Sequence, residues 1–340
     1  MPDAPLILAV VMLIALTLYA LMGGADYGGG VWDLLAMGKR ADQQRDLIAG
    51  AIGPIWEANH VWLILVVVIL FSAFPQAYSL LSVSLHIPLT LLLLGIIARG
   101  TAFTFRKYDS TKDNVQRRWG RIFAVASLIT PLLLGIIVGA ISQGKISSDI
   151  AGKSFAQVYI DAWCNIFCLA VGGFALVLFS FLAATYATVY APSEELKTDF
   201  QRRALIAQGA CALLALLVFV LAEDSAHALR VSLAQSSWSL LLQAATAACA
   251  ISSSVALLKR KFQPARVFAA GQVTLILWGW GLAQYPFLIR PDLTINNAQG
   301  AASTQALLIA AIASGAVLLF PSFYFLLKVF KHKIDQPINK

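Results

Sequence analysis

Residues 53–70 read Gly53-Pro54-Ile55-Trp56-Glu57-Ala58-Asn59-His60-Val61-Trp62-Leu63-Ile64-Leu65-Val66-Val67-Val68-Ile69-Leu70. A carboxylate, an amide and an imidazole open a segment that is otherwise apolar enough to cross a membrane. An ionisable side chain inside a bilayer costs about 2.5 to 3.5 kcal/mol on insertion scales, so such side chains usually face a protein interior and mark an ion or proton route. The stretch therefore predicts a membrane span with a functional group at its start.

The composition also indicates a membrane protein. Of the 340 residues, 59% are hydrophobic and only 12% are charged, and the mean hydropathy is +0.77. Soluble domains carry about 25% charged residues. The chain has half that share, which excludes an ordinary soluble domain.

Nine apolar stretches each have the roughly 17 to 25 residues, or more, that cross a hydrocarbon core. We expect spans at Leu6–Met22, Trp56–Phe74, Tyr78–Phe103, Ile122–Ile141, Ala156–Tyr186, Ala204–Leu221, Ser239–Leu258, Val267–Ile289 and Ala306–Leu327. The link at 74–77 is so short that spans two and three should form an antiparallel hairpin. Every connection is short, so residues 1–340 are predicted to form a single all-α transmembrane domain.

Basic residues fall mainly on one side of this arrangement. Of the 25 lysines and arginines, 20 lie in the connections after spans one, three, five and seven or in the C-terminal tail, and four lie on the opposite side. The positive-inside rule then places the N-terminus outside and the C-terminus in the cytoplasm. The net charge of +8 is thus a topology signal, and no nucleic-acid partner is expected.

A glycine-rich run follows the first span and surrounds an acid: Gly23-Gly24-Ala25-Asp26-Tyr27-Gly28-Gly29-Gly30. The spacing of Gly24 and Gly28 allows another backbone to approach closely. We consider two alternatives for Asp26. It is either solvated in an interfacial loop, or packed between helices at the cytoplasmic end as a proton acceptor.

The start of the second span carries the other candidates for a proton route. Glu57 and His60 are three residues apart and Trp56 and His60 are four apart, so the three side chains can meet on one helix face. Topology places Glu57 on the same side of the membrane as Asp26. Asn59 lies between Glu57 and His60 and can line the same route. Alternatively, Glu57 only interacts favourably with the helix dipole.

Other polar groups give weaker signals. Arg99, near the cytoplasmic end of the third span, either extends to the interface or pairs with Asp26 or Glu57. The four histidines are scattered and the four cysteines lie in apolar runs, so no haem ligands and no metal site are expected in this chain.

These motifs resemble subunit II of the cytochrome bd-type quinol oxidases. Residues 24–30 match the family's G-F-D-x-G-x-G stretch, with Ala25 in place of the phenylalanine. Residues 53–63 match its G-P-x-W-[DE]-x-N-x-V-W-L stretch, and Tyr285-Pro286 with residues 291–295 are like its Y-P…P-x-L-T-I segment. The resemblance covers the whole chain in order. Two departures are Glu57, where many members have Asp, and His60, where some have Gln; this form is similar to the cyanide-insensitive branch.

The resemblance implies two four-helix bundles plus one peripheral helix, and a heterodimer with a haem-bearing subunit I. That complex oxidises quinol and reduces O2 to water in a bacterial plasma membrane or an internal photosynthetic one. Haems b and d, or b alone, belong to the partner, while this chain can hold a structural quinone. Small accessory membrane subunits are a further expectation.

By motif, Asp26 and Glu57 are implied to be proton-pathway carboxylates, and Trp56 and Asn59 are implied to line the pathway. Two other functions fit the nine spans and buried acids. One is a proton-coupled secondary transporter, although such proteins usually show paired broken helices and this chain has one glycine-rich acidic segment. The other is a purely structural membrane partner, in which Asp26 and Glu57 only pack and form hydrogen bonds.

Overall fold

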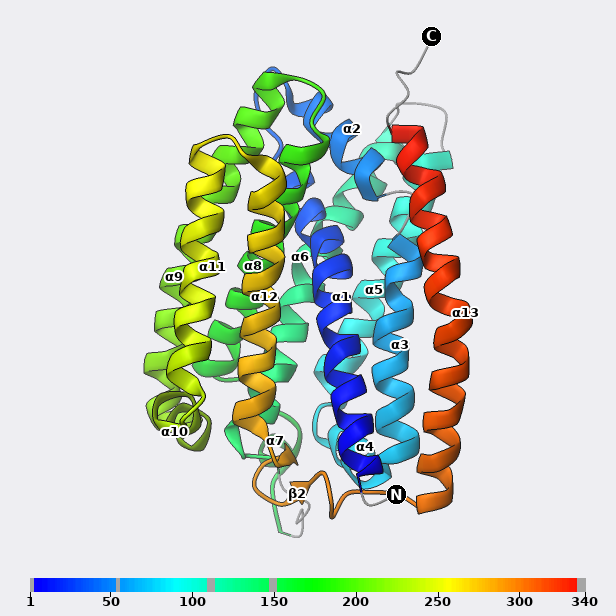
Figure 1. The fold of residues 1–340 in the computed structure, drawn as a ribbon, viewed down its shortest axis with the longest axis vertical. Helices are drawn as coiled ribbons and strands as arrows, with labels where there is room; N and C mark the ends of the chain where they lie inside the picture. The colour runs from blue at the N-terminus through cyan, green and yellow to red at the C-terminus, as the bar shows by residue number, and fades with distance from the viewer. Residues whose placement is uncertain (1–2, 53–55, 109–113, 147–151, 335–340) are drawn as a thin grey trace.

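The structure is a computed structural model that describes residues 3–52, 56–108, 114–146 and 152–334. It is almost entirely helical (Figure 1). Its elements are α1 Ala4–Leu34, α2 Ala41–Ile52, α3 Trp56–Ala73, α4 Pro75–Ser84, α5 His86–Tyr108, α6 Asn114–Gln143, α7 Phe155–Tyr159, α8 Ile166–Tyr190, α9 Glu194–Ser225, α10 His227–Gln235, α11 Ser239–Leu258, α12 Phe262–Gln284, β1 Phe287–Ile289, β2 Leu293–Thr294 and α13 Ala302–Ile334.

The long helices form two groups of four. Helices α1, α3, α5 and α6 make one group and α8, α9, α11 and α12 make the other, with α1 and α6 both packed on α8 between them. Helix α13 lies at the edge of the molecule and packs mainly on α1 and α3 (Figure 1). The predicted two bundles and one peripheral helix are therefore present.

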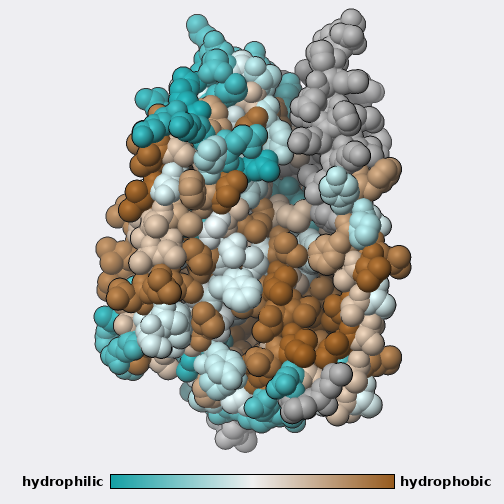
Figure 2. Space-filling view, in the orientation of Figure 1, coloured by the Kyte–Doolittle hydropathy of each residue, from teal (hydrophilic) through white to brown (hydrophobic). Residues whose placement is uncertain are grey.

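Eight helices of the described chain are long and apolar enough to cross a membrane, and α3 with α4 makes a ninth if that bent pair counts as one span. Apolar side chains cover the middle of the molecule and hydrophilic ones gather at its ends (Figure 2). Helices α1 and α13 start at the same end of the molecule, and α2 and the end of α13 lie at the opposite end (Figure 1). Following the predicted sidedness, we call the end that carries α2 the cytoplasmic end.

Two predicted spans are broken. The expected helix over Ala156–Tyr186 is the short α7 followed by α8, because Asn165 caps α8 by accepting a hydrogen bond from the Cys168 backbone at 3.1 Å. The expected hairpin between spans two and three is also wrong in detail. Helix α4 starts at Pro75 and bends by 115° from α3, so a separate short helix connects α3 to α5.

Candidate functional site

The glycine-rich run is part of a continuous helix. Helix α1 passes through all its glycines to Leu34, so the alternative in which Asp26 lies in an interfacial loop is wrong. The glycines permit close packing: a Cβ on Gly28 would overlap the carbonyl oxygen of Phe179 in α8. One turn later, the indole nitrogen of Trp32 donates a hydrogen bond to the Ser180 carbonyl at 2.7 Å. These contacts hold α1 directly against α8.

Asp26 and Asn59 form the centre of the site. Asp26 is 8% exposed and Asn59 is 2% exposed, and the Asn59 amide nitrogen donates a short hydrogen bond to the Asp26 carboxylate. The contact joins α1 to the first turn of α3. Given a rise of about 1.5 Å per residue, Asp26 lies about 12 Å below the cytoplasmic end of α1. A polar pair at this depth is held between helices, away from solvent.

Arg99 of α5 is buried beside this pair. Only 2% of Arg99 is exposed, so the alternative in which it extends to the interface is wrong. Its guanidinium carbon lies 4.7 Å from the centre of the Tyr27 ring and 5.2 Å from that of Phe123, and its Nε donates to the Ser127 hydroxyl at 3.2 Å. The aromatic faces favour a cation at these distances.

Within the described residues, Arg99 forms no direct ion pair with either carboxylate. Its charge nevertheless acts on Asp26 through space. One guanidinium nitrogen, Nη2, has no hydrogen-bond partner in the described part of the chain. The expected ion pair of Arg99 with Asp26 or Glu57 is therefore not formed among the described residues, and Arg99 is held by Ser127 and two aromatic rings instead.

Three aromatic side chains complete the cluster. The hydroxyls of Tyr19 and Tyr27 are 3.0 Å apart, and the His60 ring lies 6.0 Å from the Tyr19 ring and 6.5 Å from the Tyr27 ring, centre to centre. The sequence analysis did not select the two tyrosines. Each places a phenol within an apolar helix, and Tyr27 directly follows Asp26. That placement could have identified them from the sequence. We call Tyr19, Asp26, Tyr27, Asn59, His60 and Arg99 the polar cluster.

Glu57 lies apart from this cluster. It is exposed, whereas Asn59, two residues later, is buried. Two residues on a helix differ in direction by about 200°, so the two side chains point to nearly opposite sides of α3. The structure therefore brings Asn59 and His60 towards Asp26 and leaves Glu57 on the outer face. The side chain of Trp56 lies outside the described residues.

The three histidines whose side chains the structure describes are not placed as an axial pair for a haem. His60 lies in the polar cluster, while His86 and His227 begin α5 and α10 at the opposite end of the molecule (Figure 1). A low-spin haem needs two donors that face each other across the iron, and these positions do not fit that requirement. Within the described ranges, no group of three or more His, Cys, Asp or Glu side chains could hold a metal ion.

The chain has helices that can cross a membrane, and they bury ionisable side chains between them. It is therefore a polytopic α-helical membrane protein with an intramembrane polar site. The model of one family within this class, cytochrome bd terminal oxidase subunit II, matches residues 4–330. The chain belongs to this family.

Individual relatives agree with this assignment. The chain is 26% identical over 333 residues to a putative cytochrome bd menaquinol oxidase subunit II of Bacillus subtilis, an alignment that covers 92% of this chain and 91% of that protein. It is 32% identical over 127 residues to the cytochrome bd-I ubiquinol oxidase subunit 2 of Escherichia coli, covering 37% and 32% of the two chains.

A solved structure shows the same fold. A chain of the bd oxidase from Geobacillus thermodenitrificans superposes with a TM-score of 0.78 at 22% identity, covering 96% of this chain and 98% of that one. The predicted oxidase subunit is thus confirmed at the level of the family, and the transporter and the purely structural partner are not favoured.

Proposed function

We propose that this chain is the haem-free subunit of a heterodimeric quinol oxidase and that its partner is the haem-bearing subunit I. The complex would oxidise a quinol and reduce O2 to water, with this chain as one transmembrane domain in a bacterial plasma membrane. Support comes from the family and from relatives named as menaquinol and ubiquinol oxidase subunits. The family implies haems b and d, or b alone. The scattered histidines described above favour placing them in the partner.

The specific task that we propose for this chain is to conduct protons from the cytoplasm. The observation that carries the proposal is the buried hydrogen bond between Asp26 and Asn59. A carboxyl group can take up and release a proton, and a buried one is retained at a considerable energetic cost. The Tyr19 and Tyr27 hydroxyls and the His60 ring supply further groups that can exchange a proton beside it.

Glu57 extends this proposal towards the partner subunit. It occupies the cytoplasmic end of an exposed stripe on α3 that continues through Ile64, Val68 and Phe71, which are 60%, 42% and 60% exposed. Positions 57, 64, 68 and 71 share one helix face. A carboxylate on a face that is otherwise suited to lipid is costly unless protein covers it. We infer that subunit I covers this face and that protons cross α3 between Asp26 and Glu57.

The test replaces the carboxyl groups in the assembled oxidase. Asp26→Asn keeps the shape of the side chain and an acceptor for Asn59, so assembly and haem content should remain unchanged. Oxygen consumption should fall about tenfold or more, because a positioned proton-transfer group contributes at least that much to the rate. Glu57→Gln should also lower turnover, and Glu57→Asp should be milder because only its reach changes. Asp224→Asn, at an exposed position of α9, is the matched control.

Two results would decide against the proposal. Unchanged oxygen consumption by a well-assembled Asp26→Asn complex would leave the polar cluster with a structural role only. A complex that contains this chain but no haem would remove the oxidase assignment itself.

Slow turnover in Asp26→Asn that Asp26→Glu restores would support a proton carrier, because a purely structural contact prefers the shape of the amide.

A further inference from the structure

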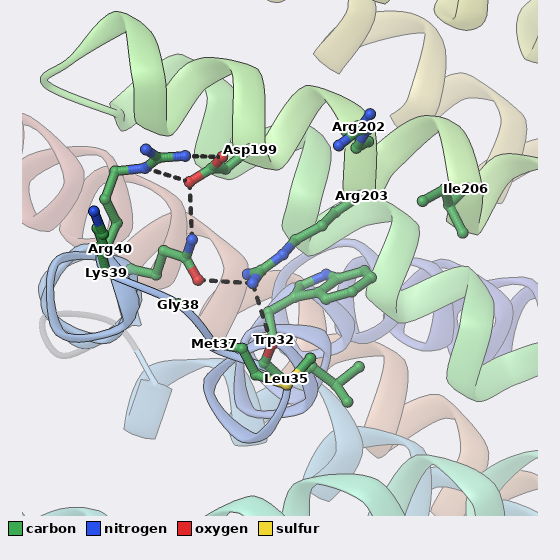
Figure 3. A pocket seen from close by; sticks show the side chains of 11 residues that line it. Trp32, Leu35, Met37, Gly38, Lys39, Arg40, Asp199, Arg202, Arg203 and Ile206 are labelled. Carbon is green, nitrogen blue, oxygen red and sulfur yellow. Dashed lines mark hydrogen bonds and ion pairs between the residues drawn. The ribbon is translucent and has the colours of Figure 1, made fainter.

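A pocket of about 550 Å³ opens at the cytoplasmic end of the molecule. It lies between the end of α1, the connection to α2 and the first turns of α9 (Figure 3). No member of the polar cluster lines it. The pocket is therefore separate from the proposed proton route and needs its own explanation.

The rim of the pocket carries more positive than negative charge. Four basic side chains line it, Lys39, Arg40, Arg202 and Arg203, together with the single carboxylate Asp199. Asp199 is bound by Arg40 at 2.6 and 2.9 Å and so compensates that one charge. Lys39 and Arg202 are exposed and form no ion pair with any residue that the structure describes. An anionic group would find two free cations here.

Arg203, the remaining basic side chain of the pocket, is held in place by neutral groups. Its Nη2 donates to the Gln44 side-chain oxygen at 2.7 Å and to the Leu35 carbonyl at 3.3 Å, and its guanidinium carbon lies 5.3 Å from the centre of the Trp32 ring (Figure 3). Its Nη1 has no hydrogen-bond partner in the described ranges. The third positive charge of the pocket is thus held in place by neutral hydrogen-bond partners, and the Asp199 carboxylate acts on it as well as on Arg40.

The other wall of the pocket is apolar and continues along the membrane-facing side of α9. Ile206, which lines the pocket, is 65% exposed, and Leu213, Leu217 and Val220 on the same helix face are 72%, 44% and 57% exposed. Leu35 and Met37 add 45% and 75% exposed side chains on the opposite side of the opening. A cationic rim above an apolar stripe matches a molecule with an anionic head and a hydrocarbon tail.

We propose that this pocket binds an anionic glycerophospholipid of the cytoplasmic leaflet. Its phosphodiester lies between Lys39 and Arg202 and one acyl chain follows the α9 face that begins at Ile206. Phosphate shares the head-group chemistry with free inorganic phosphate, but only the lipid uses the apolar face. The bound lipid would join the connection before α2 to α9 in addition to the Arg40–Asp199 ion pair.

The test measures lipid binding to the intact purified oxidase by native mass spectrometry. Phosphatidylglycerol should bind more tightly than phosphatidylcholine, and Lys39→Gln with Arg202→Gln should weaken the tightest phosphatidylglycerol site about thirtyfold, because each surface cation contributes about fivefold. Ile206→Ser should weaken phosphatidylglycerol as well. The control is Lys259→Gln with Lys261→Gln, which removes two exposed cytoplasmic cations that do not line the pocket.

Three outcomes would overturn the proposal. Phosphatidylcholine could bind as tightly as phosphatidylglycerol, or the control pair could lose as much affinity as the pocket pair. Inorganic phosphate could displace the lipid at equal concentration while Ile206→Ser has no effect, which would make the pocket a phosphate site. Turnover is not the readout, so failure here and failure of the proton route are distinguishable.

Discussion

Replacing Arg99 by glutamine should destabilise the protein, because the side chain is nearly inaccessible and makes contacts that glutamine cannot reproduce. The hydrogen bond from its charged Nε to Ser127 is worth about 1.5 to 3 kcal/mol. Its contacts with the Tyr27 and Phe123 rings add about 1 to 2 kcal/mol in a buried site. Removing the unpartnered Nη2 returns about 1 kcal/mol. The expected net loss is about 1.5 to 4 kcal/mol in the free energy of unfolding.

The assay is the thermal unfolding midpoint of the purified complex in detergent, with haem content and oxygen consumption measured on the same sample. A loss of this size should lower the midpoint by several degrees. Turnover should fall too, because Asp26 loses the positive charge that acts on it. Arg121→Gln is the control, since it makes the same change at an exposed position of the neighbouring α6. If Arg99→Gln lowers the midpoint no more than Arg121→Gln and leaves turnover unchanged, the contacts derived for Arg99 are wrong.

Two further substitutions test the packing of α1 on α8. Gly28→Ala should lower the unfolding midpoint, because overpacking costs about 1 to 3 kcal/mol. Gly315→Ala in α13 has open space around it and should leave the midpoint equal or higher. A decrease of the midpoint in both variants would contradict this account. Trp32→Phe removes one hydrogen bond and should cost about 1 kcal/mol in the same assay, and a midpoint equal to that of the unchanged protein would show that the bond contributes nothing.

Hydropathy and charge were sufficient for the class of fold and the approximate number of spans but not for their interruptions. The predicted helix over 156–186 carries only the isolated polar residues Gln157, Asp161 and Asn165 near its start, and a long hydropathy window averages them with their apolar neighbours. The structure ends α7 at Tyr159, and the intervening turn is satisfied locally by the Asn165 cap and by a hydrogen bond from the Trp163 indole to the Tyr159 carbonyl at 2.7 Å. Whether local hydrogen bonds can satisfy such a turn depends on the direction of individual side chains, which hydropathy does not report.

The same limit applies to the candidate site. The distance of Arg99 from the end of its span suggested access to the interface, yet depth along a helix does not reveal which side of the helix a residue occupies. Glu57 and Asn59 show the complementary case, since both belong to one motif and point to opposite sides of α3. The motif identified the right segment, and packing against α1 determined which of its residues meet Asp26.

The glycine-lined face of α1 has a consequence for how the protein is made. Asp26 leaves the ribosome with the first helix, but Asn59 follows 33 residues later and the Ser180 carbonyl that binds Trp32 follows that tryptophan by 148 residues. At about 5 to 20 residues per second, the second interval lasts roughly 7 to 30 s. During that time α1 presents an acid and a bare backbone groove without its α8 partner. Membrane insertion must therefore keep the first helix from pairing elsewhere until the fifth span arrives.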